Sequence, residues 1–218
     1  MRFIHDPRVP PAEVMGSHMG ASPKIALKKL ESLNREHHME IQNVARAGLS
    51  VALLAVSAWV SLPIGPVPFT LQTMVLALLP AVLDRRTACL TIAAYLLLGA
   101  LGLPVFASFG GGIGTIAGPT GGFLWGFLFG IFAATTIVRM LPKAVPPLAR
   151  VLAGDIAMIL IAYACGTVQL MGVASLDLPG ALAVAVLPFV IPDAVKVFVG
   201  ASIGLAASKA LGRVSVAR

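Results

Sequence analysis

Six long apolar stretches make up most of this chain, and lysine and arginine occur in only every second gap between them. The gaps that contain no basic residue are 63–68, 104–119 and 172–179. Cytoplasmic loops of membrane proteins carry the excess of lysine and arginine. The pattern therefore predicts an all-α integral membrane protein with six transmembrane helices and both termini in the cytoplasm.

The apolar stretches have the length and continuity of membrane helices. A spanning helix needs about 20 apolar residues, and no stretch alternates as the strands of a membrane barrel do. Pro188 and Pro192 are expected to interrupt the last stretch. The six expected helices are Val44–Leu62, Phe69–Leu83, Thr87–Leu103, Thr120–Val138, Val151–Met171 and Leu182–Ala207.

The composition excludes a soluble domain and a nucleic-acid-binding protein. Only 11% of the residues are charged and 58% are hydrophobic, whereas a soluble domain is about 25% charged. The net charge of +7 is spread over short loops and is not gathered with aromatic residues on one face. The basic residues are expected to orient the helices and to contact anionic lipid headgroups of a plasma or inner membrane.

The chain is predicted to have three parts: a leader over 1–43, a six-helix membrane domain over 44–212 and a cytosolic tail over 213–218. Within the leader, Gly16–Met19 resembles an expression-vector remnant. The charged run Lys24–Gln42 is either a linker or a cytosolic extension of the first helix. Because the first long apolar run begins only after the leader, no signal peptide is expected.

One acidic and one basic residue lie inside the last apolar stretch. Asp193 and Lys196 are three residues apart, so they share one face of a helix. Gly200 and Gly204 continue that face, and small residues mark faces that pack against protein. Charges at membrane depth are costly and are rarely kept without a role. The pair is therefore either a polar ligand site, which we favour, or an ion pair that only fixes the helix.

A glycine-rich run from Pro104 to Gly122 is the second candidate feature. Glycine lets the backbone approach a ligand closely. Phe106 and Phe109 argue against a merely flexible external loop, since disordered linkers are poor in aromatic residues. The run lacks the strand and helix context of a dinucleotide fingerprint. We expect an ordered lid whose candidate ligand-contacting residues are Gly110, Gly111, Gly112 and Gly114.

Three further polar residues occur within apolar stretches. Gln72 and Tyr95 each either join two helices by a hydrogen bond or contribute to a pocket. Asp155 is close to Arg150, and we expect it to have a structural role at the inner membrane boundary.

Two stretches carry small residues at helical spacing, which permits close helix packing. In the fourth stretch we expect packing within the molecule, whereas the first stretch is a candidate surface for a partner's helices. The residues are Gly118, Gly122, Gly126 and Gly130 in the fourth stretch and Ala45, Gly48, Ala52 and Ala55 in the first.

Several kinds of chemistry have no residues to support them. All four histidines precede residue 39, and the two cysteines, Cys89 and Cys165, lie inside apolar stretches. We therefore predict no metal site, no cofactor and no catalytic residue, which makes an intramembrane enzyme the weakest hypothesis. The chain also has no P-loop. Transport against a gradient would need energy from another subunit.

Four motifs resemble those of one membrane family. They are PVPFTLQT at 66–73, YLLLGALGLPVF at 95–106, GPTGG at 118–122 and LPFVIPDAVK at 187–196. In this order and over roughly residues 44–212, they resemble BioY proteins, the biotin-binding S components of energy-coupling-factor (ECF) transporters. Pro192 stands where the family commonly has glycine.

The resemblance implies a protein that captures biotin from outside and delivers it inward, without catalysis. It implies partners in the energised form: a transmembrane T subunit and two ATP-hydrolysing A subunits. The family's binding Asp and Lys match Asp193 and Lys196. In that reading, Phe69, Tyr95 and Phe106 pack the thiophane ring and valeryl chain of biotin. The alternative is a self-contained transporter or channel for another small solute.

Overall fold

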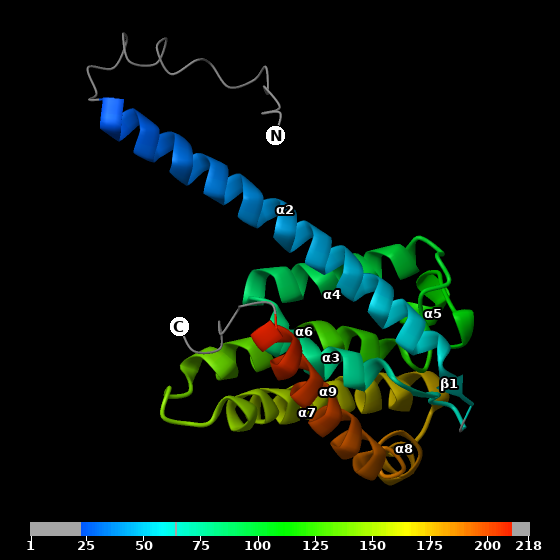
Figure 1. The fold of residues 1–218 in the computed structure, drawn as a ribbon. Helices are drawn as coiled ribbons and strands as arrows, with labels where there is room; N and C mark the ends of the chain where they lie inside the picture. The colour runs from blue at the N-terminus through cyan, green and yellow to red at the C-terminus, as the bar shows by residue number, and fades with distance from the viewer. Residues whose placement is uncertain (1–22, 64, 211–218) are drawn as a thin grey trace. The chain divides into compact units, whose positions relative to one another are not determined.

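The structure, a computed structural model, describes residues 23–63 and 65–210 and is mostly helical (Figure 1). Two short strands, β1 (Ser61–Leu62) and β2 (Phe69–Thr70), pair antiparallel. The helices are α2 (Pro23–Trp59), α3 (Gln72–Val82), α4 (Arg85–Ala100), η1 (Ala107–Phe109), α5 (Ile113–Ala117), α6 (Gly121–Met140), α7 (Pro147–Ala174), α8 (Leu178–Ala185) and α9 (Val190–Ala210).

The chain divides into two compact units within α2. The first unit ends at Ala45 and the second begins at Arg46. In the first unit, the described residues from Pro23 onwards form a continuous helix. The second unit contains all the other elements, including every predicted site residue.

The structure confirms a multi-pass membrane protein. Four described segments are long and apolar enough to cross a membrane: Ile41–Trp59, Gly121–Met140, Pro147–Ala174 and Val190–Ala210. Two helices are shorter, α3 with 11 residues and α4 with 16. The count of six crossings and the cytoplasmic termini remain predictions.

Three of the expected helices differ from the prediction. The first, expected over 44–62, spans Pro23–Trp59, and Ser61 and Leu62 form β1. The second begins at Gln72 instead of Phe69, because Phe69 and Thr70 form β2. The predicted helix 182–207 is two helices, α8 and α9, separated by residues 186–189. Pro188 lies in this break, as expected. Pro192 does not break the helix, because it lies in the first turn of α9, where backbone N–H groups have no partner within the helix.

Glycines set the spacing between α6 and α7, which run side by side (Figure 1). A Cβ added at Gly126 would lie 2.6 Å from Cα of Ala162, and one at Gly130 would lie 2.8 Å from the Met158 side chain. Such distances leave no room for a side chain. The expectation that this glycine face packs within the molecule is confirmed.

The glycine face of α9 packs on α3. A Cβ added at Gly204 would lie 2.7 Å from the Leu78 backbone oxygen, and Gly200 abuts the backbone of Met74 even more closely. The face of α9 that carries Asp193 therefore points into the bundle, as the sequence predicts.

The structure places Asp155 inside the protein. Its side chain is 0% exposed, and neither carboxyl oxygen has a hydrogen-bond partner. Asp155 lies in the third turn of α7, where the helix is already covered by its neighbours. It is therefore a core residue, and its expected structural role near the inner membrane boundary stays a prediction.

Candidate ligand-binding site

A cavity lies inside the second unit, between β2, α3, α6, α7 and α9, with η1 and α5 contributing further side chains. Four of the predicted site residues line it: Gln72, Phe106, Asp193 and Lys196. The walls are mostly apolar, and the polar groups gather around Asp193. This is the usual design of a small-molecule site.

Asp193 enters the cavity because α9 begins only three residues before it. Its backbone N–H bonds to the Phe189 oxygen, which starts the helix beside the break. The positive end of the helix dipole favours a carboxylate in the first turn. The Asp193 side chain, in a residue only 4% exposed, thus lies where the dipole of α9 favours negative charge.

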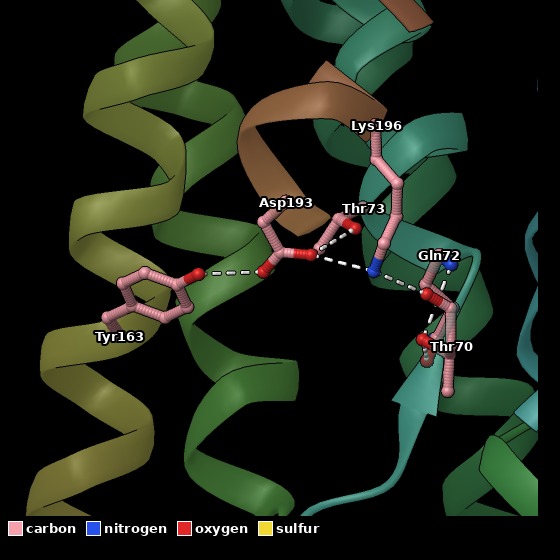
Figure 2. Close-up of polar contacts among 6 residues, drawn as sticks. All are labelled: Thr70, Gln72, Thr73, Tyr163, Asp193 and Lys196. Carbon is pink, nitrogen blue, oxygen red and sulfur yellow. Dashed lines mark hydrogen bonds and ion pairs between the residues drawn. The ribbon is translucent and has the colours of Figure 1, made fainter. Parts of the chain in front are cut away.

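Three side chains donate to the Asp193 carboxylate (Figure 2). Oδ1 accepts from Lys196 Nζ at 2.7 Å and from Thr73 Oγ1 at 3.0 Å. Oδ2 accepts from the Tyr163 hydroxyl at 2.8 Å. The donors come from α9, α3 and α7, so the carboxylate joins three helices at one point.

Lys196 is engaged on several sides. Besides Asp193, its ammonium donates to the backbone oxygen of Thr70 at 2.8 Å. It also lies 3.8 Å from the centre of the Phe69 ring, where a cation is attracted to the negative face of the ring. Lys196 is 7% exposed, so these contacts replace its water shell.

Gln72 and Tyr95 connect the residues around the Asp193–Lys196 pair to the glycine-rich segment. Gln72 Nε2 donates to the Tyr95 hydroxyl at 2.8 Å, and that hydroxyl donates to the Val105 backbone oxygen at 2.8 Å. Gln72 Oε1 also accepts from Thr70 Oγ1 at 3.2 Å. Both of the functions considered for Gln72 hold: it joins elements and it lines the cavity. Tyr95 supports the cavity without lining it.

The glycine-rich segment is packed and covers part of the cavity, as predicted. Phe106 is 1% exposed and meets Tyr95 edge-on, with ring centres 5.4 Å apart. Trp59 Nε1 donates to the Pro104 backbone oxygen at 2.7 Å. Gln169 Nε2 donates to the Gly118 oxygen at 2.7 Å. The segment is therefore anchored to α2, α4 and α7.

The other predicted residues lie around the cavity but do not line it. Phe69 stacks on Phe189, with ring centres 6.4 Å apart, and its ring faces Lys196. The four glycines that were expected to contact the ligand shape the backbone of the segment; Gly112, for example, has φ of +85°. The glycines are Gly110, Gly111, Gly112 and Gly114, and their flanking residues Ala107 and Thr115 are the ones that line the cavity.

Sequence reasoning missed three residues that hold the charged pair: Thr70, Thr73 and Tyr163. The chain has only two tyrosines, and the polar hydroxyl of Tyr163 inside an apolar stretch was a usable signal. Thr73 follows Gln72 directly, but a threonine in a membrane helix usually bonds its own backbone and indicates little by itself.

A largely apolar cavity with one ion pair, enclosed by membrane helices, defines a membrane protein that binds a small ligand. A sequence model of the BioY family matches residues 30–213. The chain belongs to the BioY family.

Relatives and a solved structure agree with this assignment. The biotin transporter BioY of Thermotoga maritima is 41% identical over 169 residues, which cover 78% of this chain and 97% of the relative. The probable biotin transporter BioY of Pyrococcus horikoshii is 39% identical, over 72% of this chain and 91% of the relative. A crystal structure of the S-component for biotin from an ECF-type ABC transporter has the same fold, with a TM-score of 0.73 at 21% identity over 79% of this chain and 93% of that one.

Proposed function

We propose that this chain is the biotin-binding S subunit of a vitamin uptake transporter and that its ligand occupies the cavity beside Asp193. The observation that carries the proposal is the buried Asp193–Lys196 pair on the cavity wall. Two relatives that align with most of this chain are named a biotin transporter and a probable biotin transporter. The chain itself captures and delivers the vitamin and performs no catalysis.

The chemistry of the cavity suits the ureido head of biotin, which offers two N–H donors and one carbonyl acceptor. The Asp193 carboxylate accepts three hydrogen bonds, and a carboxylate has about four acceptor positions. One position remains for a ureido N–H. Gln72 retains a second amide N–H for the carbonyl. Phe106 and the other apolar side chains of the wall pack the thiophane ring and the valeryl chain.

The charge pattern supports a specific topology in the plasma or inner membrane. The glycine-rich segment lies in a gap without lysine or arginine, so we place it and the mouth of the cavity outside the cell. The loops at 84–86 and 139–150 then lie inside, together with both termini. This arrangement requires α3 and α4 to complete the six crossings, with α8 and α9 forming the last one.

We further propose that an ECF T subunit and ATP-hydrolysing A subunits energise delivery. The exposed side of α2 supports a helix–helix contact in the membrane, because a Cβ at Gly48 would meet nothing within 4 Å and Ala52 is exposed. Gly48→Trp is expected to weaken assembly with a T subunit and to leave biotin binding intact. Co-purification of the subunits measures the first effect, and unchanged assembly would assign this face to lipid.

Equilibrium binding of radiolabelled biotin to detergent-purified protein tests the site. Asp193→Asn and Lys196→Ala are each expected to weaken binding by at least about 100-fold, since each leaves a buried partner unpaired. Matched controls are Asp177→Asn, at the start of α8, and Lys209→Ala, in the last turn of α9, both at exposed positions; these should bind biotin normally. Tight binding that survives both site changes in folded protein would refute the assignment.

The rival function is a self-contained transporter for another small solute. Uptake into proteoliposomes distinguishes the two functions. One set of proteoliposomes contains this chain alone, and the other contains it with T and A subunits. The proposal expects concentrative biotin uptake only with the partners and ATP.

A further inference from the structure

The charges that line the cavity cancel. Among the residues that the structure describes, Asp193 and Lys196 are the only charged side chains that line it. Their 2.7 Å ion pair makes the site neutral before any ligand arrives. Biotin, however, carries a carboxylate at the end of its valeryl chain. Under the proposed function, on which this inference rests, that charge enters a cavity with no net charge to meet it.

Lys196 is poorly placed to bind a ligand carboxylate. Two of its three N–H groups donate to Asp193 and to the Thr70 oxygen, at 2.7 and 2.8 Å. The face of the ammonium toward Phe69 lies 3.8 Å from that ring's centre. Moving the lysine to a second carboxylate would break the pair with Asp193 and leave that buried anion with less compensation, which is costly.

The remaining polar groups of the wall are neutral, and most are occupied. Thr73 and Tyr163 donate to Asp193, and Thr115 donates to the Gly111 oxygen at 2.9 Å. Thr120 is left as a wall hydroxyl that can donate to a ligand. A neutral donor can bond a carboxylate, an ester or an amide oxygen, and therefore does not select for negative charge.

We propose that this cavity recognises biotin by its uncharged ureido head and its apolar chain, with no cation paired to the ligand's carboxylate. The ligand class is then wider than free biotin: neutral tail derivatives, such as the primary amide and the methyl ester, bind with similar affinity. Selectivity lies at the head, where Asp193 and Gln72 meet the ureido group.

Competition against radiolabelled biotin on the purified full chain tests the proposal. The test ligands are biotinamide, which has nearly the size and shape of biotin without its charge, and biotin methyl ester. The control ligand is a biotin methylated on a ureido nitrogen. We expect biotinamide to bind within about threefold of biotin and the head-modified compound to bind about 100-fold more weakly.

The affinity of biotinamide relative to that of biotin decides whether the proposal holds. If biotin binds tightly and biotinamide binds more than about 30-fold more weakly, the tail charge is recognised and the proposal is wrong, while the proposed function stands. If biotin itself does not bind, the proposed function fails and this inference fails with it. A weak methyl ester beside a tight amide would overturn the wider ligand class, because the cavity would then limit the size of the tail, but it would leave the conclusion about the tail charge standing.

A second measurement examines Lys196 directly. If the lysine left Asp193 to hold the ligand carboxylate, Lys196→Met would weaken biotin far more than biotinamide. We expect Lys196→Met to reduce the affinity for biotin and for biotinamide by the same factor. In a double-mutant cycle in which one change is in the protein and the other in the ligand, equal factors mean that Lys196 and the ligand's tail do not interact. A difference of about tenfold or more would overturn the proposal.

Discussion

The hydroxyl of Tyr163 on α7 donates a 2.8 Å hydrogen bond to Oδ2 of Asp193 on α9 (Figure 2). The two residues are 30 positions apart in the chain. The contact fixes the carboxylate on the side away from Lys196, which binds Oδ1. Tyr163 therefore positions the candidate ligand-binding anion without altering the charge of the site.

Tyr163→Phe is expected to weaken biotin binding by about tenfold, because a hydrogen bond to a charged group is lost while the ring still fills its space. The measurement is equilibrium binding of radiolabelled biotin. Tyr95→Phe is the contrasting variant: it leaves all donors to Asp193 in place and removes the link to Val105. It should lower thermal stability more than affinity. Equal affinities of Tyr163→Phe and the parent protein would contradict the positioning role.

Gly126→Leu should unfold or strongly destabilise the protein, because its first side-chain carbon would already lie 2.6 Å from Cα of Ala162. Overpacking of this kind costs about 1–3 kcal/mol, and more where backbone must move. The matched control is Gly48→Leu, at a helical glycine with open space around it. Thermal unfolding in detergent should show a large fall for the first variant and little change for the second.

Asp155→Val is expected to stabilise the fold by about 1–3 kcal/mol. Both oxygens of this fully buried carboxyl lack partners, and burying an unpaired polar group carries a cost of that order. Valine replaces it with an apolar side chain of similar size. As a control, Val151→Ala, one turn earlier and also 0% exposed, should destabilise. A lower unfolding temperature for Asp155→Val would show that this carboxyl has a stabilising partner.

Asp84, in the loop before α4, should make stability depend on pH. Partial burial acts to raise the pKa of this carboxyl, but hydrogen bonds from Thr87 and Arg86 and the charge of Arg139 outweigh it and hold the pKa below its ordinary value of 3.8. The carboxylate therefore stabilises the fold above about pH 4, and this contribution disappears as the pH falls through the lowered pKa.

The size of the Asp84 effect should be modest, about 0.5–1 kcal/mol, because the residue is only partly buried and water screens its charge. Asp84→Ala should lose this stability at neutral pH, whereas Asp84→Asn keeps a capping oxygen and should lose the pH dependence. Unfolding curves at about pH 3 and pH 7 distinguish the variants. An unchanged pH response in Asp84→Asn would assign the dependence to another group.

The charged pair could be predicted from the sequence because its two members are three residues apart on one helix. The same argument placed their face toward protein, on Gly200 and Gly204, and both conclusions hold in the structure. What local spacing could not reveal is which residues complete the site. Thr70, Thr73 and Tyr163 reach the pair from other elements, and such contacts depend on how helices pack.

The sequence by itself determined that this chain enters a membrane, because long apolar stretches cannot remain in water and basic residues do not cross readily. It also determined which faces of α6 and α9 carry the glycines that pack against neighbouring helices. Only the tertiary structure decided that Pro192 leaves the last helix unbroken, that Asp155 is buried without a partner, and that Lys196 is occupied by Asp193, Thr70 and Phe69. The physical reason is that burial and hydrogen-bond geometry arise between segments distant in the chain, whereas hydropathy is a property of each segment alone.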